Sequence, residues 1–230
     1  MRRIVLLPGL DGTGALFDGF VRVAPPGVHP EVVSLPSESF SYAELAECLA
    51  PTLRLTPDTV LLAESFSGPL AISLAARHPV AALVLCNTFV APPRSRIFRA
   101  FAIPRLFHMR PPASLVRRYL VGPAASDGLV TQIRAAIESL PPSVLAGRVQ
   151  AVLTVDVASQ LARIGAPILY LRGTEDRLVP ESSVRAVIAA ASVPVSVVRL
   201  AGPHLLLQTS PMAAWDAIKA GLLQPSAAVT

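Results

Sequence analysis

The sequence predicts an α/β protein in which helices wrap a mostly parallel sheet of about six strands. Short apolar runs alternate with helical patterns along most of the chain, which is typical of β-α-β units. Several of the runs are apolar at nearly every position, as expected of strands buried on both faces. The length of 230 residues fits one large domain with its own core and an insertion.

The order of the elements follows from these runs and from the residues that begin and end helices. Strands are expected at residues 3–7, 31–35, 60–63, 82–86, 168–172 and 195–200. Helices are expected at residues 41–55, 66–78, 180–190 and 211–223. Ser41 and Glu44 have the spacing of a capping box, and a proline in the first turn marks the start of each of the last two helices.

One long segment interrupts the alternation. Between residue 91 and about residue 167 the sequence is helical, basic and aromatic, and it contains no good strand candidate. We therefore predict a core formed by residues 1–90 and 165–230, with residues 91–164 inserted as a helical cap. The net charge of +5 comes from this part of the chain, where nine arginines stand against two acidic residues between positions 89 and 150.

Composition and hydropathy exclude several classes of protein. A hydrophobic content of 52% and a mean hydropathy of +0.55 argue against disorder. No apolar run approaches the roughly 18 residues that span a bilayer, and the N-terminal apolar stretch is too short for a signal peptide. We therefore expect a soluble, cytoplasmic protein without stable membrane insertion. The basic cap contains no recognisable nucleic-acid motif, so no nucleic-acid partner is expected.

A serine stands at the junction between an expected strand and an expected helix. The stretch AESFSG, residues 63–68, is a relaxed form of the G-x-S-x-G nucleophile elbow. The side chains two before and two after the serine nearly collide at such a turn, and Ala63 and Ser67 are both small. Glu64 should point away from the serine, toward the cap or the loop near Asp11. Either a structural hydrogen bond or a charge that tunes the histidine would explain it.

An acid and a base follow at later strand ends. After the fifth expected strand comes GTEDRLVP, in which Asp176 fits a G-x-x-D pattern better than Glu175. His204 follows the last expected strand, and His108 in the cap is the weaker alternative. Taken alone, the acidic loop fits a solvated turn, and His204 fits an ordinary loop histidine. Together they place serine, acid and histidine at the carboxyl edge of the sheet, where ligands bind in open α/β folds.

A glycine-rich loop follows the first expected strand. Its sequence, LLPGLDGTG, lacks the lysine of a phosphate-binding P-loop, and its glycines do not match the dinucleotide-binding pattern. The alternative is an oxyanion hole. The backbone N–H groups of Leu10 and Phe66 would then face the negative charge that develops above Ser65 during acyl transfer.

These motifs resemble those of the α/β-hydrolase superfamily, over essentially the whole chain except the cap. LLPGLDGTG and AESFSGP are similar to a bacterial subgroup of small esterases and acyl hydrolases with plant acyltransferase-like relatives. The resemblance implies an α/β-hydrolase fold that lacks the first two family strands. It implies Ser65 as nucleophile, His204 as base and Asp176 as the acid that orients it. It also implies Leu10 and Phe66 as oxyanion donors, although Pro-Gly replaces the usual His-Gly before the first of them.

The expected function is hydrolysis of carboxylic esters of small to medium acyl chains through an acyl-enzyme, with no metal and no cofactor. A thioesterase or acyltransferase on the same triad is an alternative. A cofactor-free peroxidase and a carbon–carbon hydrolase are not excluded. The alternative from another class is a non-catalytic α/β-hydrolase that binds a small hydrophobic ligand.

The large apolar residues of the cap are candidates for a substrate pocket. They are Phe98, Phe101, Phe107, Met109 and Tyr119. Packing of the cap helices on the core is the simpler explanation for them, and an acyl pocket under an arginine-rich rim is the functional one. Besides a small-molecule ester substrate, such a rim would attract an anionic acyl carrier or a lipid surface.

Overall fold

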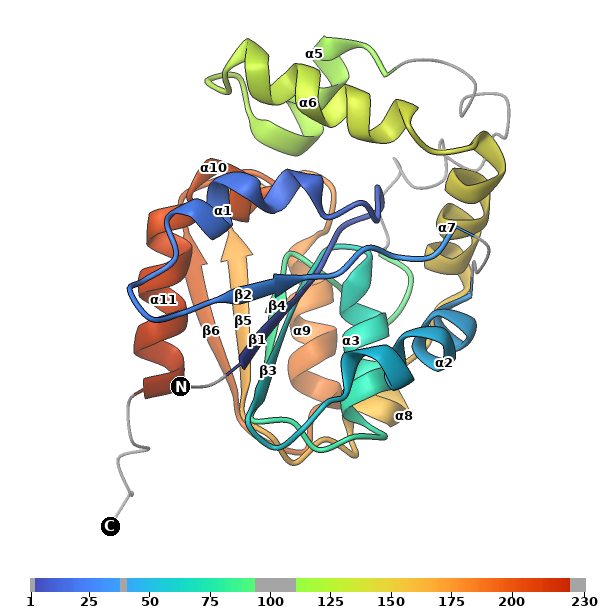
Figure 1. Ribbon diagram of the computed structural model, residues 1–230, viewed down its shortest axis with the longest axis vertical. Helices are drawn as coiled ribbons and strands as arrows, with labels where there is room; N and C mark the ends of the chain where they lie inside the picture. Colours follow the sequence, from blue (N-terminus) through green and yellow to red (C-terminus); the bar gives the residue numbers. More distant parts are fainter. Residues whose placement is uncertain (1–2, 38–40, 94–110, 224–230) are drawn as a thin grey trace.

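Six parallel strands form one open sheet in the order β2-β1-β3-β4-β5-β6 (Figure 1). The computed structural model describes residues 3–37, 41–93 and 111–223. The predicted α/β class and the strand count are confirmed. The strands are β1 (Arg3–Leu7), β2 (Pro30–Val32), β3 (Thr59–Glu64), β4 (Ala82–Cys86), β5 (Ile168–Gly173) and β6 (Val195–Leu200).

The second strand is shorter than the sequence predicts. A strand was expected at residues 31–35, but β2 ends at Val32. The N–H of Val33 still donates to the carbonyl of Leu6 at 3.0 Å, whereas the N–H of Leu35 donates to the carbonyl of Gly12 at 2.7 Å. The chain therefore leaves the sheet here and follows the loop after β1.

Helices cover both faces of the sheet (Figure 1). The helices α2 (Tyr42–Leu53), α3 (Ser67–Ala75), α8 (Ala158–Leu161) and α9 (Glu181–Ala190) pack on one face. The helices α1 (Asp18–Arg22), α10 (Leu206–Thr209) and α11 (Pro211–Leu223) lie on the other, where the short η1 (Ala15–Phe17) precedes α1. The capping box that begins α2 is present, since the Ser41 hydroxyl and the Glu44 carboxylate each accept the other residue's N–H.

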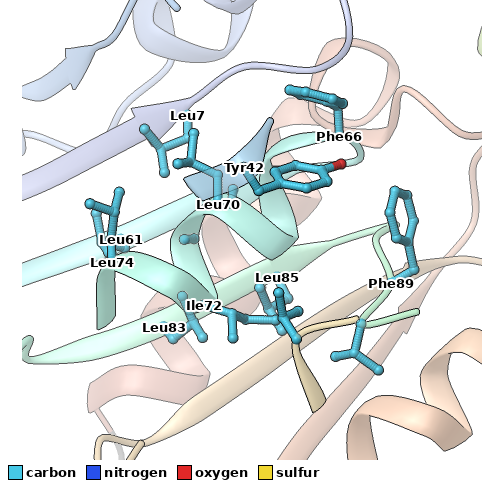
Figure 2. Packing of buried hydrophobic residues seen from close by; sticks show 14 of the residues in the cluster. Leu7, Tyr42, Leu61, Phe66, Leu70, Ile72, Leu74, Leu83, Leu85 and Phe89 are labelled. Atoms are coloured by element: carbon cyan, nitrogen blue, oxygen red, sulfur yellow. The ribbon is translucent and has the colours of Figure 1, made fainter. Parts of the chain in front are cut away.

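Alternate residues of the buried strands supply the two core layers. On β3, Leu61 and Ala63 face α2, α3 and α9, whereas Val60 and Leu62 face α1 and α11. This follows from the two-residue period of a strand. Figure 2 shows part of the first layer, with side chains of β3 and β4 beside those of α3. All six residues of β3 are buried, which explains why its sequence is apolar almost throughout.

Between β4 and β5 the described elements are α5 (Ala113–Val116), η3 (Arg117–Val121), α6 (Asp127–Glu138), α7 (Pro142–Thr154) and α8. Of these, α5 and α6 lie beyond the carboxyl ends of the strands (Figure 1). Buried residues of α6, including Ile133, form a small third cluster with Leu16 and Leu205. The division into core and cap stays a prediction, and α8, within the predicted cap, packs against α3 and α9 beside the sheet.

None of the helices that the structure describes combines the length and the apolar character that crossing a bilayer requires.

Candidate active site

Ser65 occupies a sharp turn between β3 and α3. Its backbone is left-handed, with φ of 50°, a conformation that costs about 1 to 3 kcal/mol for a non-glycine residue. Three contacts hold it: the Ser65 N–H donates to the carbonyl of Cys86 at 2.9 Å, and the Ser65 carbonyl accepts from the N–H of Gly68 and the hydroxyl of Thr88. The turn therefore has the strain that the sequence pattern predicts.

Small residues surround this turn because there is no room for larger ones. Ala63 is fully buried, and the hydroxyl of Ser67 donates to the carbonyl of Pro8. A Cβ atom on Gly68 would lie only 1.9 Å from Oγ1 of Thr88. The glycine thus sits one residue later than in G-x-S-x-G, where α3 meets the residues that follow β4.

The structure brings Ser65, His204 and Asp176 together from the ends of three strands. Oγ of Ser65 lies 2.8 Å from Nε2 of His204, and Nδ1 of His204 lies 3.0 Å from Oδ2 of Asp176. All three residues are at most 9% exposed. In the tautomer that carries its proton on Nδ1, His204 donates to Asp176 and its Nε2 accepts the hydrogen bond of the Ser65 hydroxyl.

The surroundings of Asp176 keep its carboxylate charged. Oδ1 accepts the N–H groups of Leu178 and Val179 at 2.8 and 3.0 Å, and Nη1 of Arg172 donates to Oδ2 at 2.9 Å. Burial raises the pKa of Asp176, but a protonated His204, the hydrogen bond from its ring and the N–H groups of Leu178 and Val179 outweigh burial, so the pKa lies below its ordinary value. Glu175, the other acid in this loop, is exposed.

Asn87 joins the loops that carry the acid and the histidine, and the sequence analysis missed it. Its side-chain oxygen accepts the N–H of Gly173 at 2.9 Å, and its Nδ2 donates to the carbonyls of Pro203 and His204 at 3.1 and 2.7 Å. The residue is fully buried and has a φ of 44°. Its position directly after β4, at the same edge as Ser65, is the sequence signal that could have identified it.

The two predicted oxyanion donors are Leu10, in the loop after β1, and Phe66, which directly follows Ser65. Within the described part of the chain, neither N–H donates a hydrogen bond to another residue. Phe66 is buried and Leu10 is half-buried, and unpaired backbone N–H groups of this kind are suited to bind an anion.

Glu64 is buried with its carboxylate directed at the turn that follows His204. Its Oε2 accepts from Nε2 of Gln208 at 2.9 Å, and the backbone N–H of Leu207 is a further donor. Among the described residues, its Oε1 has no partner. Burial raises the pKa of Glu64 to about 7, although Gln208 and the charge of His204 lower it. The hydrogen bond to Gln208 matches the structural explanation from the sequence, whereas a charge that tunes the histidine stays a prediction.

The structure describes only one of the five predicted pocket residues. Phe98, Phe101, Phe107 and Met109, like His108, lie outside the described residues. Tyr119 lies half-buried on η3, with the guanidinium of Arg118 5.5 Å from its ring centroid. A separate groove of about 540 Å³ between α2, α3 and α7 contains none of the three residues of the Ser-His-Asp cluster.

The chain is similar to known proteins in both sequence and structure. A model of the alpha/beta hydrolase family matches residues 4–217. A search of curated protein sequences gave no significant match. An enol-lactonase from Burkholderia xenovorans superposes with a TM-score of 0.82 at 18% identity, covering 97% of this chain and 92% of that one.

Two further structures have comparable similarity. A bromoperoxidase from Bacillus anthracis gives a TM-score of 0.81 at 17% identity, and an esterase from Exiguobacterium antarcticum gives 0.80 at 13%. Each comparison covers 97% of this chain and 92% of the other. With the family model matching nearly the whole sequence, the chain belongs to the alpha/beta hydrolase family.

Proposed function

We propose that this chain is a serine hydrolase that cleaves carboxylic esters of small to medium acyl chains through an acyl-enzyme. The observation that carries the proposal is the continuous relay from Oγ of Ser65 through the imidazole of His204 to the carboxylate of Asp176. An esterase and a lactonase, which opens a cyclic ester, are among the proteins of similar fold. They support the proposal only at the level of fold.

In the first half-reaction, Oγ of Ser65 attacks the ester carbonyl while Nε2 of His204 accepts its proton. The charged Asp176 stabilises the imidazolium that results. The carbonyl oxygen becomes an oxyanion, which the N–H groups of Leu10 and Phe66 bind. The tetrahedral intermediate then collapses, the acyl–oxygen bond breaks, and His204 returns the proton to the departing alcohol.

In the second half-reaction, water replaces the alcohol. His204 removes a proton from the water as its oxygen attacks the acyl-serine. The same two donors bind the second oxyanion, and the proton passes to Oγ of Ser65 as the acid leaves. Each missing oxyanion donor typically costs about 10²- to 10³-fold in rate.

The test is a series of p-nitrophenyl acyl esters from acetate to dodecanoate, measured with the wild type and with Ser65→Ala. We expect hydrolysis by the wild type, fastest for short or medium chains, and a loss of at least about 10³-fold in kcat with Ser65→Ala. Ser182→Ala, an exposed serine on α9, is the matched control and should keep full activity. Full activity of Ser65→Ala would contradict the proposal.

A paired acyl-thioester and oxygen ester with the same acyl group would separate the alternatives on this triad. Faster turnover of the thioester would favour a thioesterase or acyltransferase. Absence of turnover for every ester, with retained binding of a hydrophobic ligand, would favour the non-catalytic alternative.

A further inference from the structure

Arg148 on α7 is a fully buried arginine that the proposed mechanism does not use. Its guanidinium donates to three backbone carbonyls: Nη1 to those of Leu10 and Asp11 at 2.9 and 2.8 Å, and Nη2 to that of Pro36 at 3.3 Å. Among the described residues, no carboxylate lies within ion-pair distance of it. A buried cation without an ion pair is costly, so these contacts call for an explanation beyond packing.

The contacts of Arg148 fix the direction of the Leu10 N–H through a short chain of peptide groups. Arg148 holds the carbonyl of Asp11, which orients the peptide unit that contains the N–H of Gly12. That N–H donates to the carbonyl of Gly9 at 3.0 Å, which orients the peptide unit that contains the N–H of Leu10. Because C=O and N–H point in opposite directions in a trans peptide, each fixed carbonyl fixes the N–H across the same bond.

The absence of a side chain at Gly12 leaves room for this guanidinium. Its φ is +68°, in the region that favours glycine, and a Cβ atom at this position would lie 2.3 Å from Nη1 of Arg148. Any side chain at residue 12 would therefore displace the guanidinium from the loop.

The same guanidinium also contacts the second donor residue. Its central carbon lies 5.9 Å from the ring centroid of Phe66, within the range of a cation–π interaction. Tyr42 also packs on that ring, with ring centroids 4.9 Å apart, and Figure 2 shows the two rings side by side. The guanidinium of Arg148 thus interacts with both Leu10 and Phe66, the residues whose N–H groups are the proposed donors.

We propose that Arg148 is a positioning residue of the oxyanion hole. It holds the loop after β1 and the Phe66 ring in one fixed arrangement, so that the N–H groups of Leu10 and Phe66 converge above Ser65. This inference rests on the proposed serine-hydrolase function. Arginine suits the role because its planar fork of donors serves several carbonyls at once, whereas lysine offers a single ammonium group.

The test compares Arg148→Met and Arg148→Lys with the wild type on the best p-nitrophenyl ester, with rates normalised to the burst amplitude. A displaced donor should cost less than a deleted one, so we expect kcat to fall about 10- to 100-fold in Arg148→Met, with KM within about threefold. Arg148→Lys should recover part of the loss. Arg185→Met, at an exposed position on α9, is the matched control and should retain wild-type kcat.

A trifluoromethyl ketone with the same acyl chain provides a readout that a merely structural role would not change. Its adduct with Ser65 places an oxyanion in the hole, so its inhibition constant should rise by the same factor as kcat/KM falls. Binding of the product acid should change by less than about threefold. If Arg148 only supported the fold, melting temperature and active fraction would fall, but the normalised kcat and the ketone affinity would not.

Gly12→Ala perturbs the same contact from the other side. It should lower kcat in the wild-type background, and it should lower kcat less in the Arg148→Met background, where the clash with the guanidinium is absent and only the backbone strain at φ +68° remains. If the effects of Gly12→Ala and Arg148→Met on the free energy of activation were additive, the proposal would be overturned. It would also be overturned if Arg148→Met kept the wild-type kcat while Ser65→Ala was inactive. Failure of the wild type to hydrolyse any ester, or full activity of Ser65→Ala, would overturn the proposed function itself.

Discussion

Glu64 shows how a single buried group makes this protein sensitive to pH. Its side chain is 1% exposed, and its carboxylate receives hydrogen bonds from α10 only at Oε2. Among the residues that the structure describes, a charged carboxylate in this position would have no partner for its second oxygen, and burial accordingly favours the protonated form.

This environment predicts a loss of stability between about pH 4.5 and 7. The pKa of Glu64 is about 7 in the folded chain against an ordinary value of 4.5, so in this interval the folded state keeps a proton that the unfolded state has released. Stability due to this group is therefore complete below pH 4.5 and declines as pH rises to about 7. At about 1.4 kcal/mol per pKa unit, the loss is at most roughly 3 to 4 kcal/mol.

Urea unfolding of wild type and Glu64→Gln at pH 5 and pH 8 measures this effect. Glutamine cannot ionise, so the free energy of unfolding of the variant relative to the wild type should rise between the two pH values. The substitution also alters the contact with Gln208. That change affects the free energy of unfolding equally at both pH values, so it cancels in this comparison. A difference that is the same at both pH values would contradict the raised pKa.

At the scale of elements, the junction of α3 with the end of β4 sets the geometry of the turn at Ser65. Gly68 leaves space for Thr88, whose hydroxyl donates to the Ser65 carbonyl. Gly68→Ala should therefore lower the free energy of unfolding by about 1 to 3 kcal/mol through overpacking, and lower kcat/KM as well. Chemical denaturation and ester hydrolysis measure the two effects.

Gly19→Ala on α1 is the control for this substitution. No atom lies within 4 Å of the added Cβ, and alanine favours a helix over glycine by up to about 1 kcal/mol, so stability should be unchanged or slightly higher. Equal destabilisation by the two substitutions would show that the contact with Thr88 is not responsible.

The elements themselves were largely predictable from local sequence. All six strands overlap the expected ranges, and the four central strands were the clearest, because strands buried on both faces must be apolar at successive positions. The last helix, Pro211–Leu223, has the predicted bounds, since a proline is favoured in a first turn. β2 ends early because Leu35 bonds to Gly12 in another loop, a contact that no local pattern encodes.

At the scale of the whole molecule, two large apolar layers beside the sheet and one small cluster beneath α6 hold the parts together. Among the described residues, the two layers contain most of the buried side chains, whereas the small cluster contains seven. Residues in small clusters open more easily than the core. Leu16 follows the loop after β1, and Leu205 follows His204. Because both belong to this cluster, α6 packs on the segments next to that loop and next to the histidine.

Ile133→Ala tests this difference. The residue is 1% exposed and lies in the small cluster, so truncation should weaken its packing by about 2 to 5 kcal/mol. Hydrogen exchange should accelerate in α5 and α6 far more than in β3 and β4. Equal acceleration in all four elements would show that these helices unfold only together with the sheet.

The sequence by itself determined the parallel sheet, the strand order along the chain, and the candidate nucleophile, acid and base. Those features depend on local periodicity and on residue types placed at strand ends, which a single chain displays directly. Only the tertiary structure decided the 2.8 Å approach of Ser65 to His204, 139 positions apart. It also decided the partners of Asn87, Glu64 and Arg148, because a buried polar side chain is satisfied by whichever backbone groups the folded chain brings to it.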